Sequence, residues 1–312
     1  MAEVTREPAL GAGAPVLAFD VGGTDIKSAV FDASGTPRGL RRTPTPTAEG
    51  DRTEAIIERL GAIAQELAHE HPDVVPEAVG LVVPGIVDAD AGIGVFASNM
   101  GWRNAPLRDL ATARLGLPVA FDHDVGAASW AEHVRGGARS SGNAVVLVIG
   151  TGIAGAILVD GVPYTAGGYA GEIGHSPIAD GPVCPCGARG CLEAVASAGA
   201  ITRRYREATG VDPDGAKDVI ARAAAGDRVA ADIWDSALEA LTLSLAQLTA
   251  VLAPEVIVIG GGLSRAGDAL FGELRTRLAA RLSFHRLPRL VPAELSGDAG
   301  ILGAALRARE LA

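Results

Sequence analysis

Short apolar runs alternate with segments of helical periodicity along this chain. Residues 16–19 and 145–149 are entirely apolar, and the strand-like runs 26–31 and 153–159 follow them. Runs of this length and β-branched content are typical of buried strands. In residues 56–67, by contrast, Ile and Leu recur every three or four positions, which is the spacing of one face of a helix. This alternation predicts an α/β fold in which helices cover parallel or mixed sheets.

Further elements are predicted in the same way. Residues 229–252 keep the helical period and stop just before Pro254, and a helix rarely continues into the residue ahead of a proline. Asp298 stands where a carboxylate can cap a last helix over residues 299–310. The remaining strand-like segments are residues 79–83, 118–121 and 256–259.

The most informative pattern is a repeated unit of strand, glycine-rich turn and strand. Gly22-Gly23-Thr24 separates the first two strands, and Gly150-Thr151-Gly152 separates the second pair. A third turn, Gly260-Gly261-Gly262, ends another strand. Glycine allows backbone N–H groups to approach a ligand closely. The three turns therefore predict a two-lobed molecule that grips an anionic ligand between its lobes. We expect the hinge near residue 120, because the first hairpin unit ends there and the second begins soon after.

The first turn carries groups suited to a phosphate chain. Gly22 and Gly23 can point N–H donors at phosphate oxygens, and Thr24 adds a hydroxyl. Asp20 can hold Mg²⁺ through water, because this ion prefers few carboxylates and several waters. An ordinary tight hairpin turn is the alternative, and the second copy at residues 150–152 weighs against it. No Gly-Lys-Ser/Thr follows, so this is not a P-loop.

A second candidate site is Asp122-His123-Asp124, directly after a short strand. Asp124 can accept the proton of an attacking hydroxyl, as phosphoryl transfer to an alcohol requires. The alternative is that Asp122 or Asp124 caps a helix that begins near Gly126. His123 considered alone is more typical of a structural polar residue than of a catalyst.

All three cysteines of the chain lie within eight residues of one another, close to a histidine. His175, Cys184, Cys186 and Cys191 supply one imidazole and three thiolates, a complete tetrahedral set for Zn²⁺. A closed set leaves no position for a reactive water, so the predicted role is structural. Free thiols, or iron in place of zinc, are the alternatives.

Three more polar side chains are candidates for binding hydroxyl groups. Glu172 and Glu193 flank the cysteine segment, and a carboxylate can accept two hydroxyl donors. Asn99, in Ser98-Asn99-Met100-Gly101-Trp102, can also bind a hydroxyl. The alternatives are ordinary surface charge for the glutamates and an Asx turn for the asparagine.

Composition narrows the possible partners and location. The 312 residues are 48% hydrophobic with a net charge of −10, which argues against nucleic acid or an anionic membrane as the main partner. No segment has the roughly 18–20 apolar residues needed to span a bilayer. Residues 1–14 lack the apolar core of a signal peptide and are predicted to form a flexible tail. We therefore expect a cytoplasmic protein whose thiols stay reduced.

These motifs together resemble those of the ROK family, which groups bacterial sugar kinases with sugar-responsive repressors. The phosphate motifs are residues 20–24 and 150–152, the sugar motifs are residues 98–102 and 171–175, and the zinc motif is residues 184–193. The resemblance covers nearly the whole chain. Each glycine turn alone is a weak signal, but the set is highly specific.

The resemblance implies a two-lobed hexokinase/actin-like ATPase fold, ribonuclease H-like, with a cleft between the lobes. It places residues 15–121 and 297–312 in a smaller α/β lobe, so that the last helix returns to the first lobe. Residues 122–296 would form a larger α/β lobe that contains the zinc-binding loop. ATP would lie near residues 150–152 and 260–262.

The resemblance also implies roles for single residues. Asp124 would be the catalytic base, and His175 would serve both as a zinc ligand and as a sugar contact. The sugar contacts implied are Asn99, Asp124, Glu172, His175 and Glu193.

Two positions depart from the family pattern. The family usually has Glu-Asn-Asp where this chain has Asp122-His123-Asp124, and the Asn normally contacts a sugar hydroxyl. His123 is larger and can donate or accept, so it is a candidate sugar contact that changes the pocket. Many kinases of the family carry Lys after the first glycine turn, where this chain has Asp25. A carboxylate there places negative charge beside the phosphate site.

The resulting hypothesis is an ATP- and Mg²⁺-dependent kinase that phosphorylates the 6-hydroxyl of glucose, kanosamine, N-acetylglucosamine or N-acetylmannosamine. A sugar-responsive regulator is a weaker alternative, because only about 15 residues precede the first strand and the net charge is acidic. A non-catalytic sugar-binding protein is disfavoured by the presence of Asp124. The resemblance further suggests a homo-oligomer, either a dimer or a tetramer.

Overall fold

The computed structural model describes residues 10–47, 50–178 and 180–312, and the chain divides into two compact units. The first unit contains residues up to Glu132, together with Thr165–Tyr169 and Gly297–Ala312. The second contains His133–Tyr164 and Ala170–Ser296.

The first unit extends further along the chain than residue 121, the boundary expected from the sequence. Helix α3 (Asp124–Arg135) follows the last strand of the first sheet directly. Arg307 ties the start of this segment to helix α9, because its Nε donates to Asp122 Oδ2 at 2.9 Å and its guanidinium lies over the Trp130 ring. These contacts explain why residues 122–132 belong to the first unit.

Part of the expected N-terminal tail is packed against the first unit. Residues 1–9 lie outside the described part of the chain. Leu10 is buried, and its N–H donates to the Gly35 carbonyl at 2.9 Å. Arg309 donates to the carbonyls of Gly11 and Ala14. Residues 10–14 are therefore a fixed part of the structure, because one buried leucine and several backbone hydrogen bonds hold them.

The two units are built on sheets with the same strand order. In each sheet two antiparallel pairs are followed by two parallel pairs. One antiparallel pair of each sheet is the strand–turn–strand unit that the repeat in the sequence predicts. The first sheet has the order β3-β2-β1-β4-β8, formed by β1 (Val16–Val21), β2 (Asp25–Phe31), β3 (Pro37–Pro44), β4 (Ala78–Val83) and β8 (Val119–His123). The second has the order β11-β10-β9-β12-β13, formed by β9 (Ala144–Ile149), β10 (Ile153–Val159), β11 (Val162–Tyr164), β12 (Val256–Gly260) and β13 (Arg289–Pro292).

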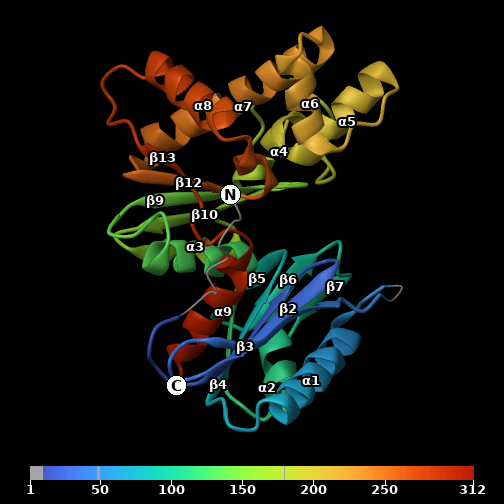
Figure 1. Ribbon diagram of the computed structural model, residues 1–312, viewed down its shortest axis with the longest axis vertical. Coiled ribbons are helices and arrows are strands. Elements are labelled where there is room, and N and C mark those ends of the chain that lie inside the picture. The colour runs from blue at the N-terminus through green and yellow to red at the C-terminus, as the bar shows by residue number, and fades with distance from the viewer. Residues whose placement is uncertain (1–9, 48–49, 179) are drawn as a thin grey trace. The chain divides into compact units, whose positions relative to one another are not determined.

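Helices cover both faces of the first sheet (Figure 1). Helices α1 (Thr53–Glu70) and α2 (Leu107–Leu115) pack on one face, where Leu17, Phe19 and Val21 point into a shared apolar core. Helix α9 (Ala299–Arg309) packs on the other face, so closely that a Cβ on Gly80 of β4 would overlap the carbonyl of Ala304. The alternate residue of β1, Asp20, points to this second face.

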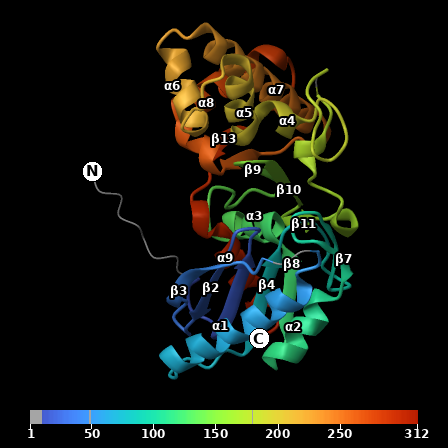
Figure 2. The same cartoon turned by 90° about the vertical axis from the view of Figure 1, so that its right-hand side faces the viewer.

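The helices α4 to α8 lie together over one face of the second sheet (Figure 2). They are α4 (Leu192–Ala196), α5 (Ala198–Thr209), α6 (Gly215–Ala224), α7 (Arg228–Leu252) and α8 (Asp268–Arg281). Their buried Leu, Ile and Ala side chains share one core with Val145, Leu147 and Ile149 of β9. Within the described ranges, every helix is too short or too polar to cross a lipid bilayer.

Short elements complete the fold and place several candidate residues. A small sheet of β5 (Ile86–Asp88), β6 (Ile93–Ala97) and β7 (Trp102–Ala105) carries the loop with Asn99. The 3₁₀ helices are η1 (Ala166–Gly168), η2 (Ile173–His175), η3 (Gly262–Ala266) and η4 (Ser296–Asp298).

Asp298 precedes α9 as expected, but it makes no side-chain hydrogen bond that caps the helix. Its carboxylate instead accepts from Lys27 Nζ at 2.7 Å. Lys27 on β2 is only 5% exposed, and a buried ammonium group needs a charged partner. The Asp298 carboxylate therefore stabilises the fold more as the partner of Lys27 than as a cap of α9.

Candidate functional site

The first glycine turn is held tightly between β1 and β2. Gly22 N–H donates to the Asp25 carbonyl at 2.8 Å, and Thr45 Oγ1 donates to the Gly22 carbonyl at 2.7 Å. The Asn99 side chain lies against the turn, since a Cβ on Gly23 would be 3.0 Å from Asn99 Nδ2. The structure therefore brings the exposed Asn99 to the first glycine turn, although 76 positions separate Gly23 and Asn99 in the sequence.

Asp20 lies at the end of β1 beside the same turn. Its carboxylate rests against Gly300 in the first turn of α9, where any side chain at position 300 would overlap it. Burial and the charge of Asp124 raise the pKa of Asp20 to about 6, while Lys27 and Arg42 act in the opposite direction. A half-buried carboxylate with so high a pKa is destabilising in its ionised form, and it is the kind of group that a cation would stabilise.

We expect Asp20→Asn to stabilise the fold at neutral pH. The folded-state pKa of about 6 lies above the ordinary value of 3.8, so ionisation at pH 8 costs the folded protein about 3 kcal/mol. Urea unfolding at pH 8 should show this gain, and the gain should shrink as the pH falls from 6 toward 4. An equal gain at pH 4 and pH 8 would contradict the assigned pKa. Asp90→Asn, at an exposed turn, is the control.

Asp25 stands where many kinases of the family carry Lys, and its negative charge is paired with a residue that the sequence did not indicate. Arg42 Nη1 on β3 lies 2.9 Å from Asp25 Oδ1 on β2. Lys27 and Arg42 are opposite each other in the register of β2 and β3. The negative charge beside the turn is thus paired with an exposed guanidinium.

The segment Asp122-His123-Asp124 occupies the junction of β8 and α3. Asp122 is buried, and it accepts from Arg307 and from His123 N–H, so its role is structural. The helix begins at Asp124, two residues before the expected start. Neither aspartate caps it in the predicted way; His123 Nδ1 accepts the Gly126 N–H at 3.3 Å.

Asp124 combines burial with partial access to solvent. Its side chain is 29% exposed, so it does not point into a sealed interior. Burial raises the pKa of Asp124, and the adjacent His123 acts against this rise. Oδ1 accepts from Val125 N–H at 2.6 Å and lies 3.2 Å from His123 Nε2. Such a carboxylate is a better proton acceptor than one in water.

In the second unit, the turn Gly150-Thr151-Gly152 is tied to the start of α5. Gly150 N–H donates to the Gly152 carbonyl, and Ala198 N–H donates to the Gly150 carbonyl, both at 2.9 Å. Glu193 Oε2 accepts from Ile153 N–H at 2.8 Å and fills the space beside Gly152, where a Cβ would overlap it. One oxygen of Glu193 therefore supports the turn.

The turns Gly260-Gly261-Gly262 and Gly150-Thr151-Gly152 lie at the same end of the second sheet, because they follow the carboxyl ends of β12 and β9, which are parallel neighbours. Gly261 has φ of 80°, and a Cβ there would overlap the Ile149 carbonyl. Only glycine fits this position without strain. The structure thus brings together both glycine turns that the sequence predicted for the second unit.

A pocket of about 290 Å³ opens beside Thr151. Most of its lining comes from α5 and the start of α6, which motif analysis of the sequence did not single out. The lining residues are Thr151, Ala198, Gly199, Thr202, Arg203, Arg206, Gly215 and Ala216. Ser197, whose hydroxyl accepts from Ala200 N–H at 3.0 Å, followed by small residues, is the sequence signal that marks this helix start.

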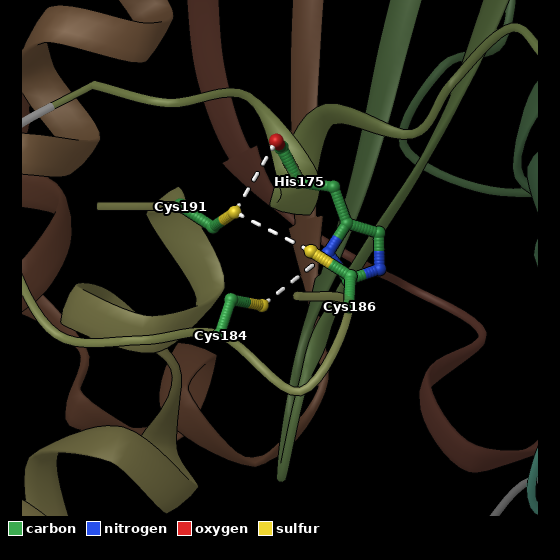
Figure 3. A group of neighbouring side chains, drawn as sticks. All are labelled: His175, Cys184, Cys186 and Cys191. Carbon is green, nitrogen blue, oxygen red and sulfur yellow. Dashed lines mark hydrogen bonds between the residues drawn. The ribbon is translucent and has the colours of Figure 1, made fainter. Parts of the chain in front are cut away.

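The four predicted metal ligands converge, as Figure 3 shows. Their ligand atoms all lie within 4.8 Å of one another. Cys186 Sγ is 3.7 Å from Cys191 Sγ, and Cys184 Sγ is 3.7 Å from His175 Nδ1. A tetrahedral zinc ion with Zn–S bonds of 2.3 Å needs sulfur atoms about 3.8 Å apart. The donor set and its spacing therefore fit a tetrahedral Zn²⁺.

The electrostatic environment of the three cysteine side chains also favours a bound cation. Burial and the two neighbouring thiols raise the pKa of Cys191 to about 12, and burial raises the pKa of Cys184. A backbone hydrogen bond from Ala188 lowers the pKa of the exposed Cys186. Three thiolates at this spacing repel one another unless a cation lies among them.

The two ring nitrogens of His175 approach different groups. Its Nδ1 points to the thiols, and its Nε2 lies 3.9 Å from Glu172 Oε2. Both residues belong to the segment around η2, and Glu172 is exposed. If Nδ1 binds a metal, the ring proton must be on Nε2, which can then donate to Glu172 or to a ligand hydroxyl.

A family model described as "ROK family" matches residues 16–310. The glucokinase of Thermotoga maritima is 35% identical, over 93% of this chain and 96% of its own length. The N-acetylmannosamine kinase of Escherichia fergusonii is 33% identical, over 94% and 98%. A ROK family glucokinase from Streptomyces griseus, solved in complex with glucose and AMPPNP, has a TM-score of 0.78 at 30% identity and covers 95% of this chain and 100% of its own. The expected two-lobed hexokinase/actin-like α/β fold is confirmed.

Proposed function

The chain belongs to the ROK family, and we propose that it is a kinase that transfers the γ-phosphoryl group of ATP to the 6-hydroxyl of a glucose-like sugar. The observation that carries this proposal is the carboxylate of Asp124. It is partly exposed, has a raised pKa, and lies close enough to Asp20 beside the first glycine turn for their charges to interact. A base and a phosphate turn in one compact unit are what an alcohol kinase needs.

Asp124 would accept the proton of the sugar hydroxyl as its oxygen attacks the γ-phosphorus. The O–P bond to the sugar forms, the bond between the γ-phosphorus and the bridging oxygen breaks, and ADP leaves. A proton acceptor near the operating pH makes this transfer efficient, and the raised pKa of Asp124 moves it in that direction.

Asp20 is the residue that would hold Mg²⁺, directly or through water. The fit rests on a half-buried carboxylate whose ionisation is costly, beside a turn that carries the Gly23 N–H and the Thr24 hydroxyl. The Gly22 N–H, which the sequence also suggested as a phosphate donor, is instead bonded to the Asp25 carbonyl inside the turn. Bound there, the ion would neutralise charge on the phosphates. Lys27 is already paired with Asp298, so it is not available as a phosphate ligand.

The second unit would bind the nucleotide through its two glycine turns. Gly150-Thr151-Gly152 and Gly260-Gly261-Gly262 lie at the same end of the second sheet, and Arg203 and Arg206 line the pocket beside Thr151. The likeness to a glucokinase solved with AMPPNP supports a nucleotide as the donor. A pocket lined by small residues and two guanidiniums suits a ribose and phosphates.

Asn99, Glu172, His175 and Glu193 are the proposed sugar contacts, together with Asp124. Asn99 is exposed beside the first turn, and Glu172 is exposed beside His175 Nε2. Glu193 uses Oε2 for Ile153, which leaves Oε1 for a hydroxyl. His123, whose ring lies beside Asp124, is a further candidate.

We propose Zn²⁺ as the metal held by His175, Cys184, Cys186 and Cys191. The set is closed, so the ion would brace the loop and supply no reactive water. Cys191 lies just before α4, which begins with Leu192 and Glu193, so the metal would also fix Glu193.

The direct test is sugar-dependent release of ADP in a coupled assay. Glucose, kanosamine, N-acetylglucosamine and N-acetylmannosamine are each supplied with ATP or with polyphosphate, and the product is mapped by NMR. We expect phosphorylation at the 6-hydroxyl of at least one sugar, with ATP as donor. The relatives that are glucokinases and N-acetylmannosamine kinases support these candidates. Sugar binding without any ADP release would overturn the proposal.

A further inference from the structure

The ring of His123 has a defined orientation between two protein groups. Nδ1 accepts the Gly126 N–H, at 3.3 Å, in the first turn of α3. A ring nitrogen that accepts an N–H carries no proton, so the proton of the neutral ring is on Nε2. Nε2 lies 3.2 Å from Oδ1 of Asp124. The helix start therefore selects the tautomer that presents an N–H to Asp124.

As a result, the two carboxylate oxygens of Asp124 have different surroundings. Oδ1 accepts from Val125 N–H at 2.6 Å and faces the His123 ring. No other residue in the part of the chain that the structure describes donates a hydrogen bond to Oδ2, although the N–H of Asp124 itself reaches its carboxylate. Two contacts on one oxygen fix the rotation of the carboxylate and leave the other oxygen available. A base that must meet a hydroxyl at one angle benefits from this restraint.

We propose that His123 is a positioning residue for Asp124: it holds Oδ1 through Nε2 and so directs Oδ2 toward the hydroxyl that is phosphorylated. This inference rests on the proposed function, because it requires Asp124 to be the base. It differs from the expectation that His123 mainly contacts the sugar. Asp124 would carry out the proton transfer, and His123 would act only through it.

Two substitutions of His123 distinguish the roles of its two ring nitrogens. His123→Asn places a polar atom near Nδ1, so it can keep the bond from Gly126, but it is too short to reach Asp124. His123→Gln places an amide N–H near Nε2, so it can keep the contact with Asp124 while it loses the helix-start bond. We expect the Asn variant to lose kcat by about 10- to 10²-fold with little change in sugar KM. We expect the Gln variant to regain most of kcat with a Tm lower by about 2–4 °C.

The opposite pattern would overturn the proposal. If the Asn variant turned over normally and the Gln variant were impaired, the helix-start bond alone would matter. If the Asn variant raised sugar KM at constant kcat, His123 would be a sugar contact. An inactive wild-type enzyme with every sugar and donor would instead contradict the proposed function, and this inference would fall with it.

A second measurement is independent of activity. The chain has six histidines, so ¹⁵N NMR of histidine-labelled protein, compared with the Asn variant, identifies the His123 signals. We expect the neutral ring of His123 to carry its proton on Nε2. A proton on Nδ1 would exclude the arrangement even in an active enzyme, and would leave the kinase proposal untouched.

Discussion

Asp124→Asn is expected to reduce kcat by about 10²- to 10⁴-fold, the usual loss when a general base is removed. The amide is nearly the same size and can still accept from Val125 N–H, so the helix start should persist. Sugar and nucleotide should still bind, because the substitution removes a proton acceptor and not a turn or a pocket. The measurement is steady-state kinetics together with calorimetric titration of sugar and nucleotide.

A second readout of Asp124→Asn comes from Asp20. The charge of Asp124 is one cause of the raised pKa of Asp20, so the pKa of Asp20 should fall from about 6 when that charge is removed. Carboxyl ¹³C NMR can follow this change. Asp90→Asn, in an exposed turn, should change neither kcat nor the titration of Asp20. Full turnover by Asp124→Asn would remove the basis of the proposed mechanism.

Loss of the metal should impair the enzyme nearly as strongly. We expect one zinc per chain by elemental analysis, and we expect Cys186→Ser to lose the metal and to reduce kcat/KM by about 10²-fold. The reason is the position of Glu193, which lies two residues after Cys191 and hydrogen-bonds Ile153 N–H beside the second glycine turn. Without the ion, the described part of the loop would depend on two isolated β-bridges and on backbone hydrogen bonds such as that from Cys184 N–H to the Ala188 carbonyl.

The control for the metal site is Ala188→Ser, an exposed substitution in the same loop that leaves all four ligands in place. It should retain zinc and full activity. A chelator should reproduce the effect of Cys186→Ser in the wild-type protein, and added zinc should reverse it. A metal-free Cys186→Ser enzyme with unchanged kinetics would mean that the loop holds Glu193 by itself.

Much of the fold could be predicted from local patterns. The strands around residues 16–19 and 145–149 and the helix at 229–252 appear where apolar periodicity placed them, as β1, β9 and α7. The metal ligands were recognisable because all four lie within 17 residues, so chain geometry alone keeps them close. The glycine turns were recognisable for a similar reason, since only glycine permits the backbone at Gly261.

Contacts between distant segments could not be predicted in this way. Residues 10–14 pack because one leucine finds a buried position, and residues 122–132 join the first unit because Arg307, 185 positions from Asp122, reaches back to it. The Asp25–Arg42 pair, the Lys27–Asp298 pair and the pocket beside Thr151 likewise depend on neighbouring strands and helices.

Local patterns in the sequence were enough to find the repeated strand–turn–strand unit, the three glycine turns and the candidate ligands of a metal, a sugar and a phosphate chain. What these side chains touch became visible only in the folded chain: Asp20 lies against Gly300, Glu193 accepts from Ile153 N–H, and His123 lies between Gly126 and Asp124. The physical reason is range. Backbone periodicity and turn chemistry act over a few residues, whereas the pKa and the orientation of a carboxylate depend on charges and donors that the sheet brings from distant parts of the chain.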